Sequence, residues 1–361
     1  MSIDHSGGEK GQEKMNAPAK AIKLAPSSEK MPEDPDMVPQ DFEPDPQSVG
    51  SNDHKHILVI KLSAFGDFIL SIRSFQAIRA HHPKADITLL TTAPYAALAR
   101  TSGCFNSVWI DKRPRIYDIP ALFKLRKDLH SGHFSRVYDL QRNDRSHLYY
   151  RLLPLNKPEW IGTIKGCSHY YKKPENGVYH IAVREKAQLE LAGIKNIQLP
   201  DLSFIKAEIE ELHLPRAYAM LVPGGAAHRP QKRWPVENYA DLAHHLTHLG
   251  ITPVIIGGSA EQAECDTIKG LCPAVRNLCR ATSLEQIAVI ARRSQFAIGN
   301  DTGPMHLISA AGCPTIVLFS AASDPNKISP IGPDVQIIQA DDLQDLSLEE
   351  VTASLPAAQL D

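Results

Sequence analysis

Asp67 is a carboxylate set between two apolar elements, in the stretch HILVIKLSAFGDFILSI. Residues 57–60 are typical of a buried strand, residues 63–66 form a turn of mostly small side chains, and an apolar helix pattern follows. An aspartate at a helix start is often an N-cap, but a polar first turn usually follows a cap. Here residues 68–70 are Phe, Ile and Leu, so a purely structural charge would be partly buried and costly. We therefore expect Asp67 to be a catalytic base.

A glycine-rich turn with basic residues follows a strand-like run in the second half of the chain. The segment VPGGAAHRPQKRWP covers residues 222–235, where Gly224 and its neighbour permit a tight backbone turn. Lys232 brings a positive charge to the start of the next helix, a position that favours anions. The segment suits a phosphate-bearing ligand, and a solvated basic loop explains the same residues equally well.

A strand and a helix meet again in AIGNDTGPMHLISAAGCPTIVLFS, residues 297–320. Asp301 or Thr302 is expected to cap a helix whose first turn holds Gly303. Free N–H groups at such a helix start can hold a diphosphate, and His306 points back toward the same end because helix side chains tilt N-terminally. We interpret the segment as a diphosphate site. The alternative is a plain helix cap with a satisfied interior histidine.

Glu261 lies in a third strand-to-helix turn, VIIGGSAEQ, residues 254–262. A carboxylate in the first turn of that helix can accept hydrogen bonds from ribose hydroxyls, as acidic residues do in many nucleotide sites of this architecture. It can also serve only to complement the helix dipole.

Short strand-like runs alternate with helical patterns from residue 56 onward, which predicts an α/β protein with two doubly wound parallel sheets. Predicted strands cover residues 56–62, 86–91, 107–110, 135–140, 217–222, 251–257, 295–299 and 314–319. Predicted helices cover residues 68–81, 95–102, 118–130, 180–193, 236–249, 260–271, 283–293 and 302–311. Residues 154–180 fit neither pattern and are expected to form loops. Because ligands of such sheets bind beyond the carboxyl ends of the strands, the site is expected in a cleft between the two units.

Composition bounds the remaining possibilities. Residues 1–54 are rich in proline and carry 11 acidic against 5 basic residues, so they have little to bury and are expected to be disordered. The six cysteines show no zinc-ligand spacing and predict reduced, mostly buried thiols. No apolar run is long enough to cross a bilayer, so we expect a cytoplasmic protein that is able to touch a membrane surface. No nucleic-acid partner is expected.

Taken together, ILVIKLSAFGDFI, PGGAAHRPQKRWP, GGSAEQ and GNDTGPMHL, in this order and separation, resemble the heptosyltransferases of glycosyltransferase family 9. The resemblance covers roughly residues 55–340 and implies a GT-B fold of two Rossmann-like domains facing a central cleft. It implies an acceptor domain (55–200) and a nucleotide-sugar donor domain (201–345), which leaves the acidic tail expected to be disordered (1–54) and a C-terminal helix or tail (346–361).

The resemblance also implies an activity and a role for each matching residue. Family members transfer heptose from ADP-heptose to the inner core of lipopolysaccharide with inversion and without a metal or other cofactor. The implied partners are a nucleotide-diphosphate sugar and a lipid-linked or glycan acceptor. Asp67 matches the catalytic base, with Ser63 and Gly66 supporting the acceptor or the turn. The matching donor-binding residues are Gly224, Lys232, Glu261, Asp301, Thr302, Gly303 and His306.

Departures from the family pattern and other functions remain open at this point. Residues 71–74 replace the usual Thr-Leu-Pro-like stretch, and alanines stand at 226 and 227 where hydroxyl residues are common. The basic and aromatic segment 139–153 suits an anionic acceptor glycan or a solvated helix face. The alternative functions are a sugar-nucleotide epimerase or hydrolase of the same architecture, and a non-catalytic nucleotide-binding scaffold.

Overall fold

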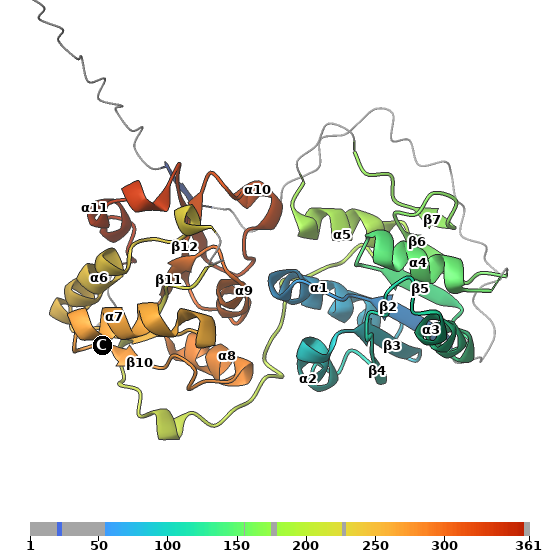
Figure 1. Ribbon diagram of the computed structural model, residues 1–361, viewed down its shortest axis with the longest axis horizontal. Helices are drawn as coiled ribbons and strands as arrows, with labels where there is room; N and C mark the ends of the chain where they lie inside the picture. Colours follow the sequence, from blue (N-terminus) through green and yellow to red (C-terminus); the bar gives the residue numbers. More distant parts are fainter. Residues whose placement is uncertain (1–19, 24–54, 155, 175–178, 226–228, 357–361) are drawn as a thin grey trace, which may run out of the picture.

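Two α/β units follow one another along the chain, each built on a sheet with helices packed on both of its faces (Figure 1). The computed structural model describes residues 20–23, 55–154, 156–174, 179–225 and 229–356. No helix in these ranges is long and apolar enough to cross a membrane.

The first unit is a parallel sheet that places the carboxyl end of its central strand at the site. Its strand order is β4-β3-β2-β5-β6-β7, so the order along the chain reverses between β2 and β5. Ile57 to Ile60 of β2 are fully buried because helices cover both faces of the sheet. The strands are β2 (His56–Ile60), β3 (Asp86–Thr91), β4 (Ser107–Ile110), β5 (Arg136–Asp139), β6 (Glu159–Gly162) and β7 (His169–Tyr170). The helices are α1 (Phe65–His81), α2 (Ala93–Thr101), α3 (Ile119–Ser131), α4 (Asp144–Leu152) and α5 (Ile181–Glu190).

The second unit repeats this order, as β10-β9-β8-β11-β12-β13, and its reversal falls between β8 and β11. Ligands of doubly wound sheets bind where the strand order reverses, so both units direct their switch points toward the segments singled out above. The strands are β8 (Tyr218–Val222), β9 (Thr252–Ile255), β10 (Arg276–Asn277), β11 (Ala297–Asn300), β12 (Thr315–Ser320) and β13 (Val335–Ala340). The α-helices are α6 (Val236–His248), α7 (Gln262–Leu271), α8 (Leu284–Arg293), α9 (Gly303–Ala310), α10 (Pro325–Ile328) and α11 (Leu348–Thr352). The short 3-10 helices are η2 (Glu210–Leu212), η3 (Pro230–Lys232), η4 (Ser259–Glu261) and η5 (Leu343–Asp345).

Two sequence expectations about local structure were wrong. Residues 154–180 were expected to form loops, but they contain β6 and β7, which are too short to show a period. Within the tail 1–54, expected to be disordered, Lys20–Lys23 form strand β1, which pairs antiparallel with β13 at the edge of the second sheet. Edge pairing uses backbone groups, which composition does not report. The rest of that tail lies outside the described residues.

The thiol prediction is confirmed. All six cysteines are free, and five of them are buried, Cys279 being the partly exposed one.

Candidate active site

The turn between β2 and α1 is held by side chains from three neighbouring strand ends. The backbone N–H groups of Leu62 and Ser63 both donate to Gln141 Oε1, at 2.7 and 3.2 Å. The carbonyl of Leu62 accepts from Thr92 Oγ1 at 2.9 Å and from an Arg113 guanidinium nitrogen at 3.0 Å. These bonds satisfy backbone groups that would otherwise be left unpaired at a strand end, and they fix the start of α1. Ser63 thus supports the turn through its backbone.

A buried ion pair anchors α1 one turn further on. Lys61 Nζ, at the end of β2, lies 3.2 Å from Glu185 Oε1 of α5, and both side chains are at most 2% exposed. Ser71 Oγ and Ser74 Oγ of α1 donate to the two oxygens of Glu185 at 2.7 and 2.8 Å. Burial alone would raise the pKa of Glu185, but the charges of Lys61 and Arg142 and the two hydroxyls outweigh it and hold the pKa below its ordinary value. The carboxylate of Glu185 therefore connects α5 to α1 and to the end of β2.

Asp67 is the third residue of α1 and is half-buried. The N-cap position belongs to Ala64, so Asp67 is no N-cap. Its backbone carbonyl accepts a 2.8 Å hydrogen bond from Ser71 Oγ, which ties it to the Glu185 network. No side chain in the described part of the chain donates a hydrogen bond to its carboxylate. The role of Asp67 as a catalytic base stays a prediction.

His306 of α9 packs directly against Gly66 and brings the two units together at Asp67. A Cβ at Gly66 would lie 2.7 Å from His306 Cδ2, so only glycine allows this approach. Burial lowers the pKa of His306 to about 4, against the opposing charges of Asp301 and Asp67. The imidazole is therefore neutral near pH 7, and its buried Nδ1 has no hydrogen-bond partner among the described residues.

Lys232 and Asp301 form an ion pair on the second unit. Lys232 Nζ lies 2.8 Å from Asp301 Oδ2, with the side chains 12% and 6% exposed. Asn300, the last residue of β11, supports both segments: its amide donates to the Gly224 carbonyl at 3.1 Å, and its Oδ1 accepts from Trp234 N at 3.2 Å. The glycine-rich loop and the residues before α9 are thus held together by a buried amide.

The start of α9 differs from the expected cap. Asp301 does not cap the helix, because its carboxylate pairs with Lys232. Thr302 occupies the N-cap position, but its side chain makes no cap hydrogen bond. Gly303 lies against the ring of Phe65 from α1, and a Cβ there would sit 2.7 Å from Phe65 Cδ1. Residues 301–304 remain partly exposed.

Glu261 lies beside the glycine-rich loop. A Cβ at Gly224 would lie 3.0 Å from Glu261 Cγ, so these two predicted residues are in contact. Glu261 Oε2 accepts a hydrogen bond from Gly258 N at 2.9 Å, which gives the carboxylate a structural role at the start of η4.

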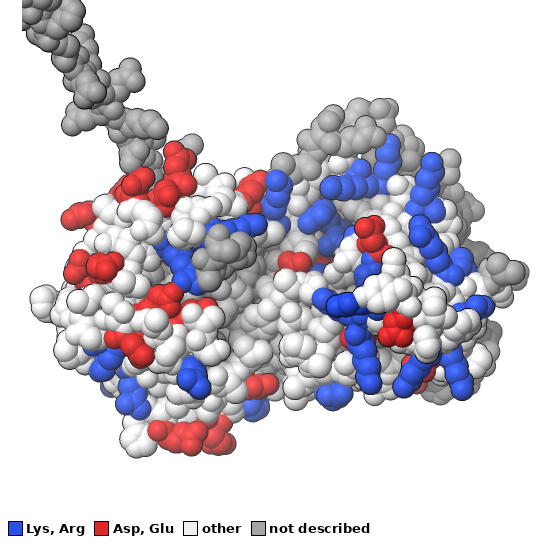
Figure 2. Space-filling view, in the orientation of Figure 1, with Lys and Arg blue, Asp and Glu red and all other residues white. Residues whose placement is uncertain are grey.

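Arg184, which sequence reasoning did not single out, lies near Asp67, and Arg142, from the basic segment 139–153, lies near Arg184. Burial and the nearby Arg142 lower the pKa of Arg184, while Tyr171 and Asp67 act in the opposite direction. Buried Arg142 Nη1 and Arg184 Nε have no hydrogen-bond partner among the described residues. Figure 2 shows Lys and Arg gathered on the first unit and more acidic side chains on the second. The first unit therefore offers unused cationic donors beside the candidate base.

Lys61 and Glu185 were also missed, although a signal for each exists. Glu185 shares a helix face with Ile181 and Leu189, which are buried apolar residues four positions away on either side. Lys61 directly ends the apolar run of β2. A charge in an apolar pattern at each of two distant positions is typical of a buried ion pair.

Solved structures show the same fold. A glycosyltransferase of family 9 from Veillonella parvula superposes with a TM-score of 0.71 at 20% identity, covering 84% of this chain and 96% of that one. The Escherichia coli ADP-heptose LPS heptosyltransferase II superposes with a TM-score of 0.67 at 23% identity, covering 82% and 97%. The chain thus has the GT-B fold that the resemblance implied.

Sequence comparison agrees with the fold. Lipopolysaccharide heptosyltransferase 2 of Salmonella typhimurium is 23% identical over 308 residues, which is 78% of this chain and 87% of that protein. Residues 175–356, half of the chain, match the model for glycosyltransferase family 9 (heptosyltransferase). With its two Rossmann-like sheets and the motifs at both switch points, the chain belongs to this heptosyltransferase family and is a glycosyltransferase.

Proposed function

We propose that the protein transfers a heptose-like sugar from ADP-heptose to a lipopolysaccharide core or related glycan, with inversion and without a metal. The observation that carries the proposal is the opposition of Asp67, an unengaged carboxylate on the first unit, to the Lys232–Asp301 pair and His306 on the second. The named relatives, which are lipopolysaccharide heptosyltransferases, support the donor and the acceptor class.

Asp67 is the base in this proposal. It accepts the proton of an acceptor hydroxyl while that oxygen attacks the anomeric carbon from the face opposite the leaving diphosphate. A single displacement of this kind inverts the anomeric configuration. Because the described residues offer Asp67 no hydrogen-bond donor, its oxygens are free to take the acceptor proton.

Lys232 and the start of α9 stabilise the leaving diphosphate. The ammonium of Lys232 has three donors and spends one on Asp301, which orients the other two. The partly exposed residues 301–304 add the positive end of a helix dipole. These groups neutralise the charge that builds on the leaving oxygen, a task that a divalent cation performs in other enzymes.

Gly224 and Glu261 hold the nucleotide in this proposal. Their close contact places a backbone without a side chain beside a carboxylate at the carboxyl end of the second sheet. Such a pair lets the ribose approach the loop and offers its hydroxyls an acceptor.

Arg142 and Arg184 bind the acceptor in this proposal. Their unused buried donors lie on the same side as Asp67 and fit an acidic or phosphorylated glycan. We place the enzyme in the cytoplasm, where the nucleotide sugar is, acting on a lipid-linked acceptor at the inner face of the inner membrane.

The test is donor and acceptor specificity measured together. The enzyme is incubated with ADP-heptose, GDP-mannose or UDP-glucose, with and without a deacylated lipopolysaccharide core, and nucleotide diphosphate and product are quantified by chromatography. The proposal expects ADP release that requires the acceptor, persists with a chelator present and gives an inverted anomeric linkage by NMR. Acceptor-independent release would indicate a hydrolase or epimerase, and no binding of any nucleotide sugar would indicate a scaffold.

A further inference from the structure

The most exposed large apolar side chains in the described part of the chain lie close together on the first unit. Ile116 is 75% exposed, Tyr117 68%, Phe123 65% and Ile119 54%, whereas no other large apolar residue described exceeds 49%. Scattered exposed apolar residues are normal in proteins, but four within eight positions form a patch that marks an interaction surface.

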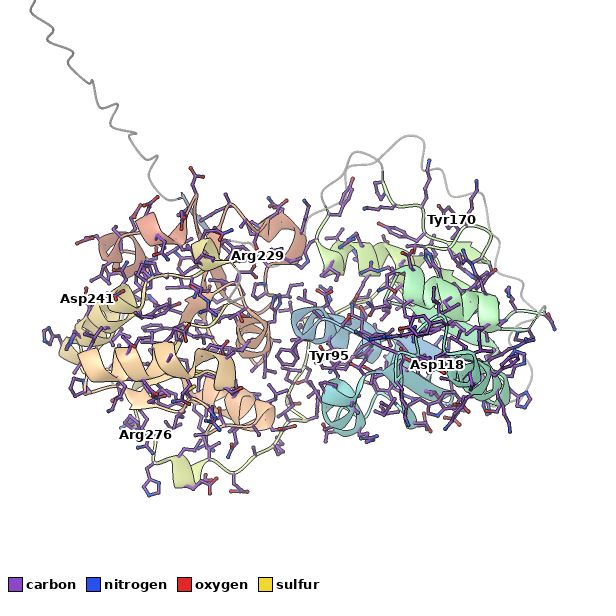
Figure 3. The ribbon with its side chains drawn as sticks, viewed as in Figure 1. Tyr95, Asp118, Tyr170, Arg229, Asp241 and Arg276 are labelled. Carbon is purple, nitrogen blue, oxygen red and sulfur yellow. The ribbon has the colours of Figure 1, made fainter. Side chains whose placement is uncertain are left out.

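Helix α3 presents part of this patch on one side. Ile119 and Phe123 are four residues apart and so lie on the same face, one turn from each other. Of its thirteen residues only Leu129 is buried, so α3 rests on the unit by a narrow contact and turns most of its surface outward. Figure 3 marks its N-cap residue, Asp118, on the side of the first unit that lies away from the second.

Basic side chains alternate with the apolar ones. Apart from Arg113, which bonds the Leu62 carbonyl, five basic residues are exposed between positions 112 and 127: Lys112, Arg115, Lys124, Arg126 and Lys127. Arg126 and Lys127 continue the face of Ile119 and Phe123 by one further turn. We call these five basic residues and the four apolar residues the α3 patch.

We propose that the α3 patch docks the enzyme on an anionic lipid surface. Exposed aromatic and branched apolar side chains among lysines and arginines are the pattern of segments that lie in the interface of a bilayer. A second copy of this chain is the weaker candidate, because two identical patches would bring ten positive charges together. The basic residues therefore favour an anionic partner, and the exposed apolar residues favour one that accepts apolar side chains.

The place of the α3 patch in the fold suits a lipid-linked substrate. The loop after β4 that carries Ile116 emerges at the same sheet edge as the turn before Asp67, and Arg113 of that loop donates to the carbonyl of Leu62 at 3.0 Å. Arg145 of α4 donates to the Pro114 carbonyl at 2.6 Å and steadies the same loop. An enzyme seated on this surface holds its acceptor side near the membrane. The inference itself needs no transferase activity and stands or fails separately.

Vesicle binding tests the inference. The full chain, without nucleotide, is sedimented with vesicles of phosphatidylcholine alone and of phosphatidylcholine mixed with phosphatidylglycerol. We expect binding to the anionic vesicles that weakens as salt is raised. Replacing Lys124 and Lys127 by glutamine should weaken it about 25-fold, since each basic residue near such a surface contributes about fivefold. The variant Ile116→Ser with Phe123→Ser should weaken it about tenfold or more.

Matched controls use exposed residues elsewhere on the molecule. Lys195→Gln with Lys206→Gln removes the same charge, and Leu271→Ser removes an apolar side chain that is 49% exposed, so neither should change binding. All variants should keep the melting temperature of the wild type. The inference is overturned if the wild-type chain ignores anionic vesicles, if α3 patch and control variants lose binding alike, or if Ile116→Ser instead dissolves a dimer measured by light scattering.

Discussion

Replacing Glu185 by glutamine tests how the turn that carries Asp67 is held. The change leaves Lys61, whose side chain is 2% exposed, without its counter-charge. Ser71 and Ser74 donate to different oxygens of Glu185, and the glutamine has only one acceptor oxygen, so it keeps one of these two hydrogen bonds. Breaking a buried ion pair by removing one partner costs about 3–5 kcal/mol, and the one hydroxyl bond that is retained favours the lower end, about 3 kcal/mol. For a unit of this size that loss corresponds to about 10 °C in melting temperature.

The assay is urea unfolding followed by tryptophan fluorescence, in which Trp109 and Trp160 report on the first unit. A double variant, Lys61→Met with Glu185→Gln, is the matched control. It removes both charges of the pair, so it should recover much of the stability that the single variant loses. If Glu185→Gln unfolds within about 1 kcal/mol of the wild type, the ion pair does not hold the turn and the reasoning is refuted.

The same carboxylate predicts a pH dependence with a definite sign. Its pKa in the folded chain lies below the ordinary value of 4.5, so the folded state favours the charged form. The stability it contributes is fully present above pH 4.5 and is lost as the pH falls through the folded value. Glu185→Gln should therefore show a flatter stability profile on the acid side than the wild type does.

Three further predictions concern the junction of the two units. Lys232→Gln removes the cation and leaves Asp301, which is 6% exposed, without its partner. The affinity for ADP, measured by calorimetry, should therefore fall about tenfold or more. An unchanged affinity would exclude Lys232 from the diphosphate site. Gly66→Ala puts a methyl group 2.7 Å from His306, so kcat/KM should fall about tenfold or more. The control Gly270→Ala, with no neighbour within 4 Å, should leave kcat/KM unchanged. If Gly66→Ala keeps the wild-type kcat/KM, the close approach of His306 to Gly66 is not required. The pKa of His306 is about 4 in the folded chain and 6.5 in the unfolded chain. As the pH falls from 6.5 to 4, the unfolded chain takes up a proton at this histidine and the folded chain does not, so about 3 kcal/mol of stability should be lost. His306→Gln should remove that loss in urea titrations, and an unaltered profile would contradict the burial argument.

The parts of the fold that could be predicted are those written in local patterns. The apolar run of β3 gave its bounds residue for residue, because a strand covered on both faces has no polar alternation to confuse it. The bounds of β4 were also predicted correctly, although its four residues are exposed or only partly buried. Strands β6, β7 and β10 have two to four residues each, too few for any period. They exist because a neighbouring strand offers them backbone partners, which is a tertiary effect.

The candidate site shows the same division. Asp67 and Lys232 follow recognisable strand-to-helix turns, and the structure brings their two units together at α1 and α9. The Lys61–Glu185 pair joins residues 124 positions apart, so neither local pattern names its partner. Of the two residues expected to cap α9, Thr302 takes the N-cap position and Asp301 does not, because its carboxylate pairs with Lys232, 69 residues earlier.

The most direct test of the account is the turnover of Asp67→Asn, measured beside its affinity for ADP. The carboxylate has no structural partner among the described residues, so the amide should fold normally and bind ADP within about twofold of the wild type. Loss of the general base should lower kcat by about 10²–10⁴-fold. A variant that keeps wild-type turnover would contradict the assignment of Asp67 as the base. It would also contradict the proposed reaction, in which Asp67 faces Lys232 and the start of α9 across the site.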